Sequence, residues 1–147
     1  MADIVILNGP NLGRLGVREP DVYGTLSYDD LVASAQSWGS AHDLTVEVFQ
    51  TDSESEMIGW LHAAVDEGAD VVLNPAAFTH FSYAIRDAAA MVTKGGRHLI
   101  EVHISNPYAR EEFRHHSVVG GIATGTIAGF GFHSYKLAIE ALVHLRA

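Results

Sequence analysis

Cysteine is absent from this sequence of 147 residues, so the protein can form no disulfide and has no thiolate nucleophile or thiolate metal ligand. No run reaches the roughly 18 apolar residues that a membrane-spanning helix needs. The first residues also lack the basic start and the apolar core of a signal peptide. These absences predict a protein of the cytoplasm that does not bind membranes.

Positive charge is scarce as well. The net charge is −9, which argues against a nucleic-acid partner because phosphates are bound by lysine and arginine. Four of the seven arginines nevertheless fall in two stretches that have the composition of loops, and these are Arg14, Arg18, Arg110 and Arg114. In an acidic protein, this concentration predicts a local positive pocket for a small anion.

The sequence does contain a regular alternation of strand-like and helix-like segments. Strands are predicted over residues 4–7, 44–49, 71–73, 99–102 and 122–128. Helical spacing lies between them, with Ser27 and either Ser53 or Ser55 as N-caps, and a third helix is marked by Phe81, Ile85, Ala88 and Val92. The pattern predicts one α/β domain over residues 1–147, with a flavodoxin-like five-stranded parallel sheet and helices on both faces.

The longest loop signal follows the first predicted strand. Residues 8–24 hold four glycines and two prolines, which favour a loop over a helix. A long loop at the carboxyl end of a parallel strand is where α/β proteins build binding sites, and loops of this length often act as lids. We expect a lid over about residues 13–24, because Gly13, Gly16 and Gly24 permit large backbone changes.

Polar side chains recur where three of the predicted strands end. They are Asn11, Arg18 and Tyr23 after the first strand, Asn74, Thr79 and His80 after the third, and Glu101, His103, Ser105, Arg110 and Arg114 on or after the fourth. Because the carboxyl ends of parallel strands meet at one edge of a sheet, these side chains should lie close together. Two histidines at this edge are candidates for proton transfer.

Short motifs that share a family pattern occur in order along nearly the whole chain. They are Asn8-Gly-Pro-Asn-Leu, Gly16-Val-Arg-Glu-Pro, Tyr23-Gly24, Asn74-Pro75 with Thr79-His80, Arg86-Asp87-Ala88, Glu101-Val-His-Ile-Ser-Asn106 and the stretch from Ala109 to Ser117. Each motif is weak alone, but the set resembles the type II 3-dehydroquinate dehydratases. The resemblance implies a flavodoxin-like fold and the loss of water from 3-dehydroquinate, which gives 3-dehydroshikimate through an enolate in the shikimate pathway or in quinate catabolism. It also implies a small anionic substrate, no cofactor, no metal, and a twelve-subunit assembly built from trimers.

The same resemblance implies roles for individual residues. Tyr23 would remove a proton beside the ketone, with Arg18 next to it on the lid, and Asn11 would order a water on the enolate oxygen. His103 would protonate the departing hydroxyl, with Glu101 behind it. The implied substrate-binding residues are Asn74, His80, Ile104, Ser105, Arg114 and Asp87, the last of which would reach the site of a neighbouring subunit.

A tyrosine base needs a lowered pKa, since its ordinary value is about 10. Lowering it to about 8 takes roughly 2.7 kcal/mol in favour of the phenolate. One cation at about 4 Å supplies roughly 4 kcal/mol at an effective dielectric near 20, before desolvation takes some of it back. Arg18 is the first candidate for this cation, and Arg110 is a supporting one.

Lysine usage bears on how a ketone substrate would be activated. A Schiff base needs a lysine in the site, but only Lys94 and Lys136 are present and neither lies in a polar cluster. An enolate stabilised by hydrogen bonds is the route that is left.

Three alternatives from other classes stay open at this point. A flavodoxin-like FMN-binding protein would share the fold, but the residues after the first strand offer no Ser/Thr-rich phosphate loop. A metal hydrolase is suggested by nine histidines, although the adjacent His115 and His116 do not easily face one ion. A non-enzymatic assembly protein is the third, and a substrate assay separates it from an enzyme.

Overall fold

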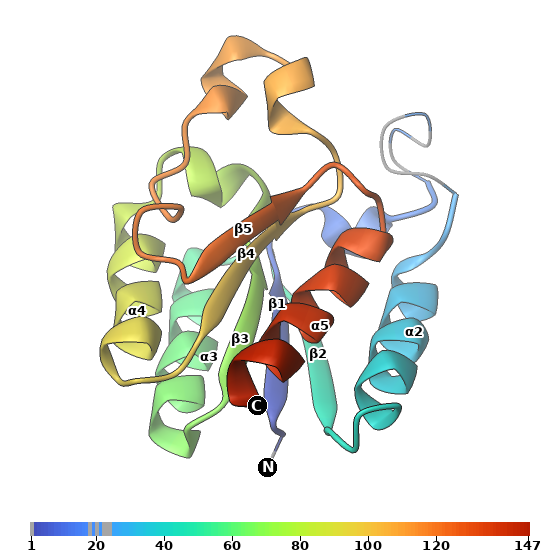
Figure 1. Cartoon of the computed structure of the whole chain (residues 1–147). Coiled ribbons are helices and arrows are strands. Elements are labelled where there is room, and N and C mark those ends of the chain that lie inside the picture. The colour runs from blue at the N-terminus through green and yellow to red at the C-terminus, as the bar shows by residue number, and fades with distance from the viewer. Residues whose placement is uncertain (1, 18, 20, 22–24) are drawn as a thin grey trace.

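The computed structural model describes residues 2–17, 19, 21 and 25–147, and its strands form one five-stranded sheet (Figure 1). All neighbouring strands are parallel, in the order β2-β1-β3-β4-β5. The strands are β1 (Ile4–Asn8), β2 (Val46–Gln50), β3 (Asp70–Asn74), β4 (Leu99–His103) and β5 (Gly125–Ala128). This is the flavodoxin-like order, so the predicted fold class is confirmed.

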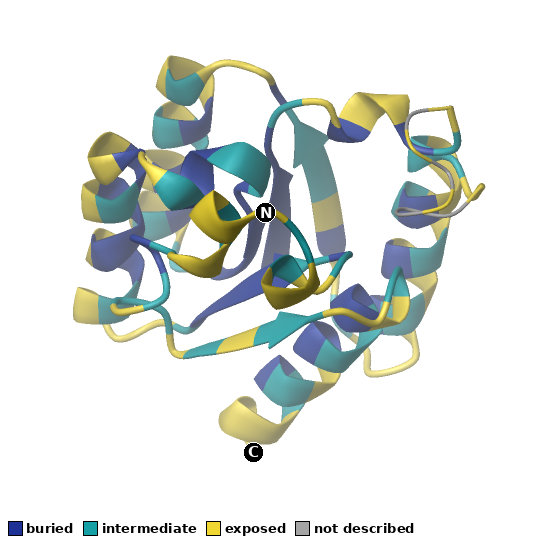
Figure 2. Cartoon of the chain, turned by 90° about the horizontal axis from the view of Figure 1, so that it is seen from above, coloured by how far each residue is buried: buried dark blue, intermediate teal, exposed yellow. Residues whose placement is uncertain are grey.

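Two helical layers cover the sheet, because successive side chains of each strand point to opposite faces. Helices α3 (Glu54–Glu67) and α4 (Tyr83–Lys94) pack on one face, and α2 (Tyr28–Ser40) and α5 (His133–Arg146) pack on the other. Figure 2 shows the buried residues on the strands and on the inward sides of the helices. In the described part of the chain, no helix is long and apolar enough to cross a membrane.

Serine side chains cap α2, α3 and α4. Ser27 forms a capping box with Asp30, as predicted, and Ser53 rather than Ser55 caps α3. Of the residues predicted to mark the third helix, Ile85, Ala88 and Val92 lie on α4. Phe81 does not, because Ser82 accepts a hydrogen bond from the Ile85 N–H and caps the helix. Phe81 lies outside the helix and is exposed.

The last predicted strand is also shorter than expected. It begins at Gly125 rather than at residue 122, because Ile122 and Thr124 are used in other contacts. The Ile122 N–H donates to the Val119 carbonyl in a turn, and the Leu99 N–H donates to the Thr124 hydroxyl. The Thr124 N–H still donates to the Leu99 carbonyl at 2.7 Å, so the Thr124 hydroxyl and the turn at Ile122 replace only part of the ladder that a longer strand would form.

The carboxyl ends of β1 and β3 lie side by side at the point where the strand order reverses. Asn8 pairs with Asn74 in the sheet register, and the Gly9 N–H donates to the Asn74 carbonyl at 2.8 Å. A Cβ on Gly9 would lie 2.4 Å from the Pro75 carbonyl oxygen, so only glycine permits this approach. Such a switch point is where doubly wound sheets hold their ligands.

Candidate active site

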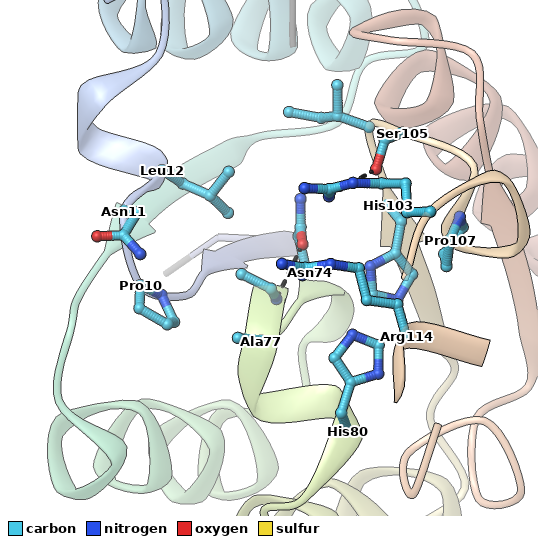
Figure 3. A pocket seen from close by; sticks show the side chains of 13 residues that line it. Pro10, Asn11, Leu12, Asn74, Ala77, His80, His103, Ser105, Pro107 and Arg114 are labelled. Atoms are coloured by element: carbon cyan, nitrogen blue, oxygen red, sulfur yellow. Dashed lines mark hydrogen bonds between the residues drawn. The ribbon is translucent and has the colours of Figure 1, made fainter. Parts of the chain in front are cut away.

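A cavity of about 190 Å³ opens at this switch point, and its lining side chains are drawn in Figure 3. The loop after β1 contributes Pro10, Asn11 and Leu12, and the segment after β3 contributes Asn74, Ala76, Ala77 and His80. The end of β4 and the loop after it contribute the rest, which are His103, Ile104, Ser105, Pro107, Arg110 and Arg114. Segments distant in sequence therefore meet in one hollow at the carboxyl edge of the sheet.

The cavity is positive although the chain as a whole is acidic. Its charged lining residues are Arg110 and Arg114, and no carboxylate is among the lining residues that the structure describes. Arg110 donates to the Ser105 hydroxyl at 3.3 Å, and the Arg114 guanidinium lies over the Phe113 ring, 4.6 Å from its centroid. Glu111 pairs with Arg114, and Glu19 lies 3.7 Å from Arg110, but neither carboxylate is among the described lining residues. The two guanidinium groups are therefore the charges that line the cavity, and they favour an anionic ligand.

A buried carboxylate supports the histidine at the end of β4. Glu101 is almost completely buried, and its Oε2 lies 2.5 Å from Nε2 of His103. The Thr79 hydroxyl donates to the same oxygen at 2.7 Å, and the Ser117 hydroxyl donates to the carboxylate at 3.0 Å. Ser117 is itself held by the N–H groups of Val119 and Gly120. The carboxylate therefore accepts from three side chains that are each fixed in place.

These contacts decide which nitrogen of His103 can exchange protons with a ligand. Burial raises the pKa of Glu101, but the hydrogen bonds from His103, Thr79 and Ser117 outweigh it, and the pKa lies below its ordinary value. The carboxylate is therefore ionised near neutral pH and can only accept, so Nε2 of His103 carries a hydrogen. Nδ1 is then the nitrogen that remains for a ligand.

His80 is held as a neutral side chain at the other wall of the cavity. Its Nδ1 lies 2.7 Å from the His116 carbonyl oxygen, which can only accept, so Nδ1 carries the hydrogen. Burial lowers the pKa of His80, and the positive charge of Arg114 adds to this shift. His80 therefore offers an unprotonated Nε2, which can accept a hydrogen bond from a hydroxyl group.

Comparison with known proteins identifies the family. The sequence profile of the family described as Dehydroquinase class II matches residues 2–143. The chain is 56% identical over 139 residues to 3-dehydroquinate dehydratase of Salinispora tropica, with 95% of each chain covered. It is 50% identical over 140 residues to 3-dehydroquinate dehydratase of Bacillus licheniformis, covering 95% of this chain and 94% of that one. This chain belongs to the class II dehydroquinase family.

Solved structures of dehydroquinases agree with this assignment. The crystal structure of the type II dehydroquinase from Propionibacterium acnes superposes with a TM-score of 0.92 at 53% identity, over 98% of both chains. That from Butyrivibrio crossotus gives a TM-score of 0.91 at 44% identity, over 95% of both chains. The family membership leaves the FMN-binding alternative without support.

Most residues predicted for the dehydroquinase site lie together in the structure. Those that line the cavity are Asn11, Asn74, His80, His103, Ile104, Ser105, Arg110 and Arg114. Glu101 contacts the cavity through His103 rather than lining it. Arg14, which was expected in the positive pocket, is exposed and lies outside the lining. The two arginine-rich stretches have a similar composition, and composition alone does not show which of their arginines line the cavity.

Four predicted features are not placed in this cavity. Tyr23 and Arg18 lie outside the described residues, as does part of the segment 13–24 predicted to be a lid. Asp87 is on α4, exposed, and paired with the neighbouring Arg86 at 2.9 Å. It does not belong to the cavity lining of its own chain.

The sequence analysis also missed residues that support the site. Ser117 was not singled out, although it holds Glu101. Tyr135 was not recognised as the partner of Asn74, nor Asn8 as the partner of Tyr135. A signal was present for Asn8, because a polar residue closes a strand that is otherwise apolar. Among the described residues, no three histidine, aspartate or glutamate side chains are grouped to hold a metal ion.

Proposed function

We propose that this protein removes water from 3-dehydroquinate to give 3-dehydroshikimate, in the shikimate pathway or in quinate catabolism. The observation that carries the proposal is the buried Glu101–His103 pair at the edge of a cavity whose charged lining residues are both arginines. An anionic substrate is bound there by positive charge, next to a group that can give a proton. Relatives of this chain that are named 3-dehydroquinate dehydratase, at 50–56% identity, support the same substrate.

In the first step, Tyr23 takes a proton from the carbon beside the ketone, and the electron pair moves to the ketone oxygen as an enolate. Arg18 and Arg110 favour the phenolate form of Tyr23 by their charge. Asn11 holds a water that donates to the enolate oxygen. This assignment of Tyr23, Arg18 and Asn11 follows the family resemblance, and the presence of Asn11 and Arg110 among the lining residues of the cavity supports it.

In the second step, the carbon–oxygen bond to the departing hydroxyl breaks and the enolate electrons form the new double bond. His103 gives the proton from Nδ1 to the hydroxyl, which leaves as water. Glu101 gives the charged imidazole an ion-pair partner before this transfer. Afterwards Tyr23 holds one extra proton and His103 lacks one, so exchange with solvent restores both.

The direct test is to add 3-dehydroquinate to the purified protein and follow the ultraviolet absorbance of the conjugated enone product. We expect turnover that survives EDTA and that is not lost when borohydride is added with the substrate. Inactivation by borohydride would indicate a Schiff base and contradict the enolate route. No turnover by a folded protein would contradict the proposed function as a whole.

The role of Tyr23 has its own test. Tyr23→Phe removes only the acidic oxygen, so the variant should fold and assemble normally and lose nearly all turnover. A general base typically contributes about 10²–10⁴-fold. A variant that keeps more than about a tenth of the activity would show that another group is the base.

We also propose that residues 1–147 form one catalytic unit, in which residues 13–24 close over the substrate. We propose further that the protein is cytoplasmic and that its subunits assemble as a tetramer of trimers. Exposed aromatic side chains on α4 and on the loops near the cavity support an assembly; they are Phe81, Tyr83, Tyr108 and Phe113. Asp87, exposed on the same helix, is available to a neighbouring site. Sedimentation analysis should give the mass of twelve chains, and a monomer with full activity would contradict this.

A further inference from the structure

A chain of buried hydrogen bonds runs from the sheet to the cavity. Its members are Asn8 at the end of β1, Tyr135 on α5 and Asn74 at the end of β3, and all three are almost completely buried. The Asn74 Nδ2 donates to the Tyr135 hydroxyl at 2.8 Å, and this hydroxyl donates to Asn8 Oδ1 at 2.6 Å. Of the three, Asn74 lines the cavity, and Asn8 and Tyr135 are not among its described lining residues.

A backbone carbonyl fixes the donor-to-acceptor direction of these hydrogen bonds at the Asn8 end. The Asn8 Nδ2 donates to the Phe49 carbonyl at 3.1 Å, and a carbonyl can only accept. Oδ1 of Asn8 must then face Tyr135 as an acceptor. Burial raises the pKa of Tyr135, so the phenol keeps its one hydrogen and gives it to Asn8. The phenol oxygen is left as an acceptor for Asn74.

At the Asn74 end, a backbone N–H fixes the orientation of the amide in the same donor-to-acceptor direction. The Ala76 N–H, which can only donate, lies 3.1 Å from Asn74 Oδ1. Turning the Asn74 amide over would place its nitrogen against this N–H and its oxygen against the phenol oxygen, and both hydrogen bonds would be lost. Asn74 Nδ2 carries two hydrogens and gives one to Tyr135, so the second remains for the cavity.

We infer that Tyr135 and Asn8 are positioning residues, which hold the Asn74 amide so that it presents a donor and not an acceptor to an oxygen of the substrate. The inference rests on the proposed function, because it takes Asn74 as a substrate-binding residue. Neither Tyr135 nor Asn8 touches the substrate. Their effect is transmitted through one amide, whose orientation is set by groups on two other strands and a helix.

The first variant is Tyr135→Phe, measured by steady-state kinetics with 3-dehydroquinate. Phenylalanine leaves Asn74 without its acceptor, so we expect KM to rise about 10-fold, the upper end for one hydrogen bond between neutral groups. We expect kcat to stay within about two-fold, as for lost binding that is equal in ground and transition states. A merely structural role would reduce the amount of folded enzyme and leave KM unchanged.

The matched control is Tyr28→Phe. Tyr28 is a half-buried tyrosine packed against the same apolar cluster as Tyr135, and it is not part of the hydrogen-bonded chain. Both changes remove one phenol oxygen from the same layer. KM and kcat of Tyr28→Phe should equal those of the wild type.

The second variant, Asn8→Ala, tests the chain at a residue further from the cavity. It removes the acceptor of the Tyr135 hydrogen, which can then turn toward Asn74 and favour the wrong orientation of the amide. We expect KM to rise as in Tyr135→Phe. In an Asn74→Ala background, adding Tyr135→Phe should change KM less than about two-fold, because the residue being oriented is gone.

Unchanged KM in both Tyr135→Phe and Asn8→Ala would overturn the inference, as would effects that add fully in the double variant. The wild-type assay separates this failure from a failure of the proposed function. If the wild type turns over 3-dehydroquinate and the variants keep its KM, only the inference is wrong. If the folded wild type does not turn it over, the proposed function is wrong.

Discussion

Two carboxylates are buried at opposite ends of the same sheet, and they are held in different ways. Asp70 begins β3, and its Oδ2 accepts from Arg146 Nε at 3.0 Å while Oδ1 accepts from the His98 N–H at 3.0 Å. Glu101, near the end of β4, accepts from two neutral hydroxyl groups and from His103. Asp70 thus has a permanent cation as its partner, and Glu101 has one that can lose its charge.

We expect this difference to separate a carboxylate that serves the fold from one that serves the reaction. Arginine stays protonated near neutral pH, so the partner of Asp70 is a fixed cation that gives no proton to a ligand. The guanidinium also donates to the Asp3 carbonyl, which ties α5 to the start of the first strand. The Glu101–His103 pair can exist with and without a proton, which is what general acid catalysis requires.

The largest expected effect is that of changing the titratable partner. His103→Gln keeps a hydrogen-bonding side chain but cannot give a proton at neutral pH, so kcat should fall about 10³-fold. Arg146→Gln is the matched change at the other end and should leave kcat of the folded enzyme within about two-fold, since Arg146 has no part in proton transfer. Steady-state rates of the two variants test this, and equal losses would remove the distinction.

The free energy of unfolding should respond in the opposite order, with a larger loss for a change at Arg146 than for one at His103. Arg146→Ala leaves Asp70 buried with its charge uncompensated, which costs about 3–5 kcal/mol for a fully buried pair. The Arg146 side chain is 31% exposed, so we expect a loss of about 2 kcal/mol in the free energy of unfolding. Urea titration measures it. A loss for His103→Gln that is as large as that for Arg146→Ala would show that both pairs serve the fold.

A smaller effect is expected in the dependence of stability on pH. The pKa of Glu101 is lower in the folded protein than its ordinary value of 4.5, so below about that pH the unfolded chain binds more protons. The stability that Glu101 contributes is present above pH 4.5 and is lost as the pH falls through the folded value.

The measurement is the free energy of unfolding between pH 6 and pH 3 for the wild type and Glu101→Gln. The wild type should lose more stability than the variant over this range. The lowered pKa of His80 also reduces stability as the pH falls below about 6.5. It does so in both proteins, and somewhat more in Glu101→Gln, which lacks the carboxylate charge that raises this pKa. Parallel curves would show that the hydrogen bonds to Glu101 do not favour its ionised form.

The fold was largely predictable because its signals are local. Apolar runs and serine caps mark the strands and helices, and five strands separated by helices leave few arrangements. The errors lie where tertiary contacts set the first residue of an element. The start of α4 depends on the capping bond of Ser82, and that hydroxyl also donates to Glu54 at 2.6 Å, in a helix 28 residues earlier.

The place of a residue in the cavity was predictable where it ends a strand, as Asn74 and His103 do, or follows one in the next short segment, as His80 does. Support for the cavity was not predictable where a residue acts from a distant element. Ser117 reaches Glu101 from 16 residues away, and Tyr135 reaches Asn8 across 127 residues. No spacing rule links these positions, because only the packing of α5 and of the loop after β4 brings them together.

The most direct test of this account compares Glu101→Gln with Asp70→Asn, since each replaces one buried carboxylate by its amide. At equal concentrations of folded protein, we expect kcat for 3-dehydroquinate to fall about 100-fold in Glu101→Gln and to stay within about two-fold of the wild type in Asp70→Asn. If Glu101→Gln keeps wild-type turnover, or if both variants lose turnover equally, the carboxylate behind His103 does not serve the reaction as proposed here.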